Sequence, residues 1–147
     1  MDSTFRYEFA NDFDAFAEMA SAASAAGDRL GLSPHTAYSI DLVLEELVTN
    51  IIKYGYDDPG KHLITVELAA ADDGAVALTL TDDGHRFDPV EKAKRDAAAP
   101  NKMNSDELQV GGWGLSLVLR SSSAFTYERT NGKNITRVTF APDAPKK

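Results

Sequence analysis

Hydrophobic and polar residues alternate in five short stretches of the chain, a pattern typical of strands that bury one face. The strands predicted from this alternation cover residues 4–10, 62–70, 75–82, 125–130 and 135–141. Turn-forming residues, Asp72-Asp73-Gly74 and Asn131-Gly132, join the second strand to the third and the fourth to the fifth. The chain is therefore expected to contain two antiparallel hairpins.

Other stretches repeat their apolar residues every three or four positions, as helices packed on a core do. The first is rich in alanine, has Asn11 or Asp12 as its N-cap, and is expected to end at Gly27. The second begins with Ser33 as N-cap and Pro34 in its first turn. The predicted helices cover residues 13–26, 34–54, 90–97 and 114–122.

Hairpins with helices grouped before and between them favour an α+β fold. We expect a two-layer sandwich, in which the helices pack on one face of a mostly antiparallel mixed sheet. The length of 147 residues predicts a single domain over residues 1–147. Between about residues 88 and 112 the periodicity fades into charged and small residues, which is typical of a lid-like loop.

Composition excludes several classes of function. The chain has no cysteine, so disulfides, thiolate metal sites and cysteine nucleophiles are ruled out. Its 15 basic and 23 acidic residues give a net charge of −8, which argues against nucleic acid or an anionic membrane as a partner. Neither a secretion signal nor an apolar run of the roughly 18 residues that span a membrane is visible. We expect a cytoplasmic protein.

Three groups of residues could carry chemistry. On the second long helix, Glu46, Asn50 and Lys53 share one flank of the apolar stripe, where they could serve as a base, a Mg²⁺ ligand and a phosphate contact. The third predicted strand ends in Thr81-Asp82-Asp83-Gly84, and Gly111-Gly112-Trp113-Gly114-Leu115 opens a helix, where backbone N–H groups favour an anion. Taken singly, each group also fits a solvated helix face, a simple turn or a flexible hinge.

The order of these motifs, ExxxN(xxK), then DxGxxFDP, then GGxGL, resembles the GHKL ATP-binding fold. Within that superfamily, the segment from Glu46 to Tyr56 and the late Gly132-Lys133-Asn134 resemble the anti-sigma-factor serine kinases of bacterial signalling. The resemblance spans residues 33–140 and implies ATP and Mg²⁺ as cofactors. Arg86 stands where the wider superfamily often has a second glycine.

The resemblance also implies roles for individual residues. Asn50 would coordinate Mg²⁺, Glu46 would act as the catalytic base, and Lys53 would contact phosphate. Asp82 would accept a hydrogen bond from the adenine amino group, next to Gly84, which lets the backbone approach the base. The remaining nucleotide-binding residues implied are Gly111, Gly112, Gly114, Leu115 and, on the last strand, Thr136.

The function implied is that of an ATP-dependent serine-protein kinase and anti-sigma-factor-like regulator. Its substrate would be a serine on a STAS-type anti-anti-sigma protein, and a sigma factor and a second copy of the chain are further expected partners. The alternative is a nucleotide-gated protein-binding module without phosphotransfer. A third reading, an α+β domain without a ligand, requires all three motifs to be purely structural.

Overall fold

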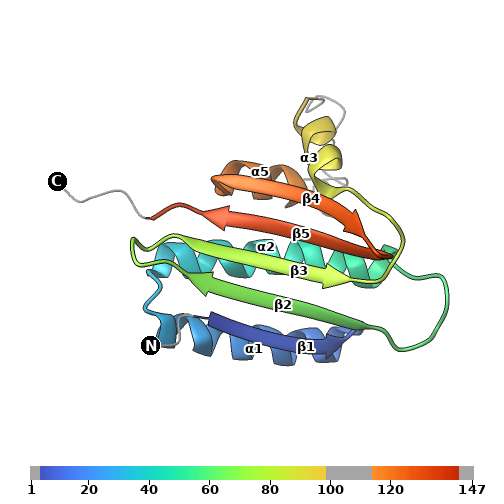
Figure 1. Cartoon of the computed structure of the whole chain (residues 1–147), viewed down its shortest axis with the longest axis horizontal. Coiled ribbons are helices and arrows are strands. Elements are labelled where there is room, and N and C mark those ends of the chain that lie inside the picture. Colours follow the sequence, from blue (N-terminus) through green and yellow to red (C-terminus); the bar gives the residue numbers. More distant parts are fainter. Residues whose placement is uncertain (1–3, 99–113, 143–147) are drawn as a thin grey trace, which may run out of the picture.

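The computed structural model describes residues 4–98 and 114–142. Five strands form one sheet in the order β1-β2-β3-β5-β4, and all four pairings between neighbours are antiparallel. Four helices are present in these residues. In Figure 1, α1, α2 and α5 lie behind the sheet, and α3 lies beyond the edge strand β4, at the top of the view. The expected α+β sandwich is confirmed. The described elements are β1 (Thr4–Ala10), α1 (Phe13–Leu30), α2 (Pro34–Tyr54), β2 (Leu63–Ala70), β3 (Val76–Asp82), α3 (Pro89–Ala98), α5 (Gly114–Ser121), β4 (Ala124–Thr130) and β5 (Lys133–Phe140).

The start and end of α1 have clear local causes. The Asp12 carboxylate accepts a hydrogen bond from the Ala15 backbone N–H at 2.7 Å, which caps the first turn. The prediction that this helix ends at Gly27 is wrong. Gly27 is a buried residue inside the helix. The helix ends only before Gly31, whose φ of 74° favours glycine.

Both hairpins are confirmed. Between β4 and β5, Asn131 and Gly132 have φ values of 53° and 75° and join Thr130 directly to Lys133, which is the geometry of a two-residue type I′ turn. Gly74 has a φ of 96° in the turn between β2 and β3. The expected single domain with a lid-like loop at 88–112 stays a prediction. Helix α3 covers only the first part of this loop, and residues 99–113 lie outside the described residues.

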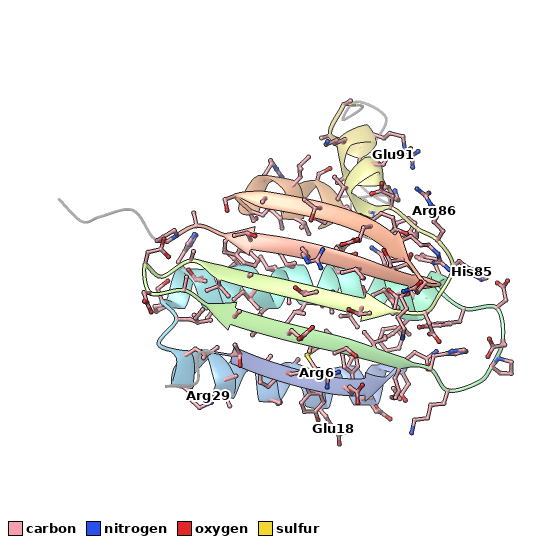
Figure 2. The ribbon with its side chains drawn as sticks, in the orientation of Figure 1. Arg6, Glu18, Arg29, His85, Arg86 and Glu91 are labelled. Carbon is pink, nitrogen blue, oxygen red and sulfur yellow. The ribbon has the colours of Figure 1, made fainter. Side chains whose placement is uncertain are left out.

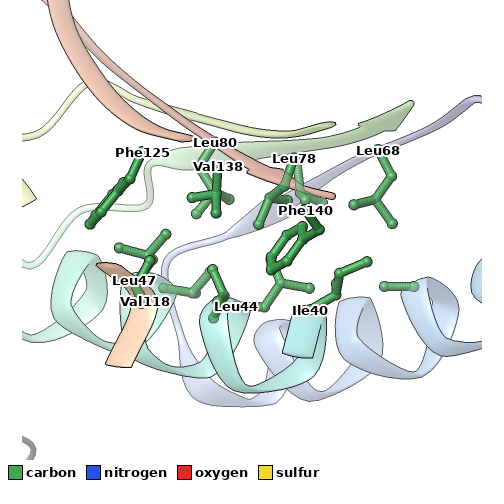
Figure 3. Packing of buried hydrophobic residues seen from close by; sticks show 14 of the residues in the cluster. Ile40, Leu44, Leu47, Leu68, Leu78, Leu80, Val118, Phe125, Val138 and Phe140 are labelled. Carbon is green, nitrogen blue, oxygen red and sulfur yellow. The ribbon is translucent and has the colours of Figure 1, made fainter. Parts of the chain in front are cut away.

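The core lies between the sheet and helices α1, α2 and α5 (Figure 3). Ile40, Leu44 and Leu47 of α2 face side chains from the strands, as their three-and-four-residue spacing predicts. This packing fixes α2 against the sheet, so the positions of its polar flank are fixed as well. The labelled strand residues that meet the helices are Leu68, Leu78, Leu80, Phe125, Val138 and Phe140.

Candidate functional site

A pocket of about 150 Å³ opens at one end of the sandwich, where β3 ends and the chain turns toward α3. In Figure 1 this is the end of the sheet with the loop from α2 to β2. The polar side chains of the lining come from α2, β3, β5 and the turn after β3. The lining residues are Leu47, Asn50, Ile51, Tyr54, Gly55, Leu80, Asp82, His85, Arg86, Phe87, Pro89, Asn134 and Thr136.

Asp82 is the buried carboxylate of this pocket, with 6% of its surface exposed. Its Oδ1 accepts hydrogen bonds of 2.9 Å from the backbone N–H of Gly84 and from Nδ2 of Asn134. Because both bonds use the same oxygen, Oδ2 is left to face a ligand. Burial raises the pKa of Asp82, and the hydrogen bond from Asn134 acts in the opposite direction.

Gly84 lets the turn after β3 approach the end of α2. A Cβ at this position would lie 2.6 Å from the carbonyl oxygen of Gly55, closer than two such atoms can approach. The same carbonyl accepts a hydrogen bond of 2.8 Å from the backbone N–H of His85. A side chain at position 84 would therefore push the turn, and with it Asp82, away from the helix.

Glu46 and Asn50 lie one turn apart on α2, and both are half-buried. Asn50 Nδ2 donates to Glu46 Oε1 over 3.4 Å, which leaves the amide oxygen of Asn50 for another partner. Burial raises the pKa of Glu46, while this hydrogen bond and the charges of Lys53 and Lys92 oppose the rise. Asn50 lines the pocket that holds Asp82, whereas Glu46 faces a smaller adjoining groove between α2 and α5.

Gly114, the first residue of α5, packs directly on Glu46. A Cβ at Gly114 would overlap the carboxylate of Glu46, so any other residue requires one of the two elements to shift. Gly114 also lines the groove that Glu46 faces. The first and third motifs of the sequence thus meet at one carboxylate, although Glu46 and Gly114 are 68 residues apart in the chain.

The remaining predicted residues differ in whether they line the pocket. Thr136 is buried at the pocket wall, two residues from Asn134 on the same face of β5. Lys53 is exposed and does not line the pocket. Leu115 is 2% exposed and belongs to the hydrophobic core, so its side chain is not brought to the pocket. Gly111 and Gly112 lie outside the described residues.

Sequence reasoning missed the buried polar group behind Asp82. Asn134 is 4% exposed on β5 and pairs with Asp82 across the sheet. Its Oδ1 accepts hydrogen bonds from the Tyr127 hydroxyl and from Nη1 of Arg129. The strand predicted over residues 135–141 begins one residue after Asn134. The available signal was that Asn134 continues the alternation of Thr136 and Val138, which would make it a buried amide that requires hydrogen-bond partners.

A second polar group ties the loop after α2 to the turn after β3. The His62 ring stacks on Tyr56 with a centroid distance of 4.2 Å, and its Nε2 lies 3.0 Å from Asp58. Asp83 accepts a hydrogen bond from the Tyr56 hydroxyl at 3.0 Å and lies 3.5 Å from Nδ1 of His62. Asp58 raises the pKa of His62. Figure 2 shows His85 at the same end of the sheet, and this residue pairs with Asp57 at 3.1 Å.

The described residues contain no cluster of three or more His, Cys, Asp or Glu side chains that could hold a metal ion. A divalent cation at this site would therefore take most of its ligands from a bound phosphate and from water, as Mg²⁺ commonly does. The amide oxygen of Asn50 is a suitable single protein ligand for a cation held in that way. Within residues 4–98 and 114–142, no helix is long and apolar enough to cross a membrane.

Comparison with known proteins identifies the family to which this chain belongs. The chain matches the histidine kinase-like ATPase domain family over residues 9–140. It is 32% identical over 76 residues to the anti-sigma F factor of Heyndrickxia coagulans, a match that covers 52% of this chain and 49% of that protein. It is 29% identical over 79 residues to the anti-sigma F factor of Priestia megaterium, covering 54% and 51% of the two chains. The match thus spans about half the length of these relatives.

Solved structures share the fold at low sequence identity. The RsbU and RsbW domains of Rv1364c from Mycobacterium tuberculosis align with a TM-score of 0.67 and 17% identity over 98% of this chain and 34% of that one. The SiaB-SiaC complex from Pseudomonas aeruginosa aligns with a TM-score of 0.60 and 21% identity, over 92% and 88%. A histidine kinase domain from Erythrobacter litoralis aligns with a TM-score of 0.51 and 18% identity, over 86% and 59%. The chain belongs to the histidine kinase-like ATPase domain family, and membership of this family implies ATP binding.

Proposed function

We propose that this protein is an ATP-dependent serine-protein kinase and anti-sigma-factor-like regulator in a partner-switching pathway. Its substrate is a serine on a STAS-type antagonist protein. One observation carries this proposal: the pocket of Asp82 and the carboxylate of Glu46 are joined through Asn50, and Gly114 packs on that carboxylate. A nucleotide bound with its base at Asp82 would extend its phosphates past Asn50 toward Glu46.

At the base end, Asp82 Oδ2 accepts a hydrogen bond from the adenine amino group. The other carboxylate oxygen is already held by Gly84 and Asn134, so the acceptor is oriented before the nucleotide arrives. Leu47 and Leu80 supply apolar contact to the ring. The buried hydroxyl of Thr136 provides a second polar contact on the adenine side.

At the phosphate end, Asn50 would hold Mg²⁺ through its amide oxygen. The cation neutralises charge on the phosphates when it is bound. Lys53 lies on the same flank of α2 but is exposed, so it contacts a phosphate only if its side chain bends toward the pocket. Backbone N–H groups at the start of α5, beside Gly114, favour the negative charge of the terminal phosphate.

The serine hydroxyl of the partner binds next to the carboxylate of Glu46. This carboxylate faces the groove between α2 and α5, whose apolar floor includes Leu42, Leu117 and Val118. In the transfer, the hydroxyl oxygen attacks the γ-phosphorus, the bond to the β-phosphate oxygen breaks, and ADP leaves. Glu46 orients the hydroxyl and accepts its proton, although positioning and electrostatic stabilisation supply most of the rate in such reactions.

Relatives support the regulatory part of the proposal. The two curated relatives are anti-sigma F factors, and one structural neighbour is a chain of the SiaB-SiaC complex, which favours a protein as the partner. A sigma factor and a second copy of the chain are further partners that we propose. The setting is the bacterial cytoplasm, which fits the absence of cysteine from the sequence.

The test is a phosphotransfer assay with γ-labelled ATP, Mg²⁺ and purified STAS-domain proteins from the same genome. The wild-type protein should label a serine of one of them, and Glu46→Gln should abolish labelling while it keeps ATP affinity. Glu45→Gln is the matched control, because Glu45 is the exposed neighbour on the same helix. ATP-dependent binding of a partner without any labelling would instead establish the nucleotide-gated module.

A further inference from the structure

The side chain of Asn134 is the most connected buried polar group next to the pocket. It lies directly opposite Asp82 in the pairing of β3 with β5. Its Nδ2 donates to Asp82 Oδ1 at 2.9 Å, to the His85 carbonyl at 2.8 Å and to the Gly84 carbonyl at 3.4 Å. A single amide group thus holds three successive parts of the turn that begins with Asp82.

The orientation of this amide is fixed by its other side. Oδ1 of Asn134 accepts from the Tyr127 hydroxyl and, at 2.9 Å, from Nη1 of Arg129. Arg129 is a pure donor, so the oxygen and not the nitrogen of the amide must face it. Arg129 also donates to the Gly84 carbonyl at 2.9 Å. The amide nitrogen therefore has to point at Asp82.

We propose that Asn134 is a positioning residue that makes the pocket selective for adenine. It holds Oδ1 of Asp82 so that Oδ2 faces the 6-position of the base, and it holds the Gly84-His85 peptide at the pocket wall. This inference rests on the proposed function, because it requires a nucleotide in the pocket. It assigns base selectivity to a residue of the last strand that does not itself accept the adenine hydrogen bond.

The charge around Asp82 shows what loss of the amide would do. Burial raises the pKa of Asp82, and the charge of Asp83 raises it further, whereas the hydrogen bond from Asn134 and the charge of Arg129 oppose the rise. Replacing the amide by a carboxylate in Asn134→Asp keeps the shape and the acceptors for Tyr127 and Arg129. It removes the donor and sets a second carboxylate against Asp82, so protonation of Asp82 is favoured.

The experiment compares binding of ATP and of inosine triphosphate, which carries a carbonyl where ATP has the amino group, between pH 5.5 and 8.5. Wild type should prefer ATP at least about tenfold. In Asn134→Asp, ATP binding should weaken about tenfold at pH 7.5, binding of inosine triphosphate should change little, and the acid limb of the ATP profile should move to higher pH. If Asn134→Asp does not fold, Asn134→Ala replaces it, and the same loss of preference for ATP over inosine triphosphate is expected.

Tyr127→Phe is the control, since it disturbs the same network on the far side of the amide and leaves the bond to Asp82 in place. It should retain the preference for ATP within about twofold. Equal loss of both nucleotides in the Asn134 variants, with an unshifted pH profile, would show that Asn134 is merely structural and would overturn the inference. If wild type binds neither nucleotide, the proposed function fails first, and the positioning role fails with it.

Discussion

Replacing Gly114 by alanine should separate phosphotransfer from ATP binding. The added methyl group would occupy the position of the Glu46 carboxylate, so either α5 shifts or the carboxylate rotates away. The backbone itself accepts alanine, since Gly114 is not among the described glycines with positive φ. The effect therefore comes from the clash with Glu46 alone.

The size of the effect follows from the position of the clash. Overpacking at a half-buried site costs about 1–3 kcal/mol in the free energy of unfolding. Displacement of a group that orients and deprotonates the acceptor costs about 10²- to 10⁴-fold in rate. The three atoms nearest to the new methyl group all belong to Glu46, which does not line the pocket that holds Asp82 and Asn50. ATP affinity should therefore fall by less than about tenfold, the equivalent of 1.4 kcal/mol.

The assay measures labelling of the partner serine at saturating ATP, together with a urea denaturation of each variant. Gly31→Ala is the control, because Gly31 has a φ of 74° and an added Cβ would meet nothing within 4 Å. Its strain costs about 1–2 kcal/mol of stability at a distance from the site. Gly31→Ala should be destabilised but active, and Gly114→Ala inactive. A Gly114→Ala variant with the wild-type transfer rate would refute the proposed catalytic role of the carboxylate on which Gly114 packs.

Two further predictions use the charged groups near the pocket. Asp82→Asn should lose at least about tenfold in ATP affinity, because it presents an amide donor to the adenine amino group. Its stability at pH 7.5 should equal or exceed that of wild type, because burial raises the pKa of Asp82 and disfavours its charge; a large destabilisation in urea would contradict this. Asp58 raises the pKa of His62, so the stabilisation from this pair is complete below pH 6.5 and is lost as the pH rises through the raised value. Melting temperatures between pH 5.5 and 8.5 should therefore fall in wild type and fall less in His62→Gln, and identical slopes would argue against the pair.

The elements of the fold could be predicted where the signal is local. The N-cap and proline at residues 33–34 and the Asn131-Gly132 turn act within a few residues, and both predictions are confirmed. The prediction that Gly27 ends the first helix was wrong because the end of a helix depends on which glycine adopts a positive φ. Helix α1 continues through Gly27 as far as Gly31. A glycine in sequence does not reveal whether it ends a helix or permits close packing inside one.

The site could be predicted in part for the same reason. The spacing of Glu46 and Asn50 is a property of one helix, so their adjacency followed from the sequence. The role of Asn134 depends on the register between β3 and β5, which joins residues 52 positions apart. The burial of Leu115 likewise depends on how α5 meets the sheet. Such contacts arise from the tertiary fold and leave only a weak trace in the local pattern.

The most direct test of the ATP site is a calorimetric titration of the protein with ATP, with and without Mg²⁺, in wild type and in Asn50→Ala. The account predicts binding in the micromolar range, about −8 kcal/mol, for wild type with Mg²⁺. Removal of Mg²⁺ and the Asn50→Ala substitution should each weaken binding, and their effects should not add, because both remove the same contact. No heat of binding from wild type under either condition would contradict the assignment of this pocket to ATP.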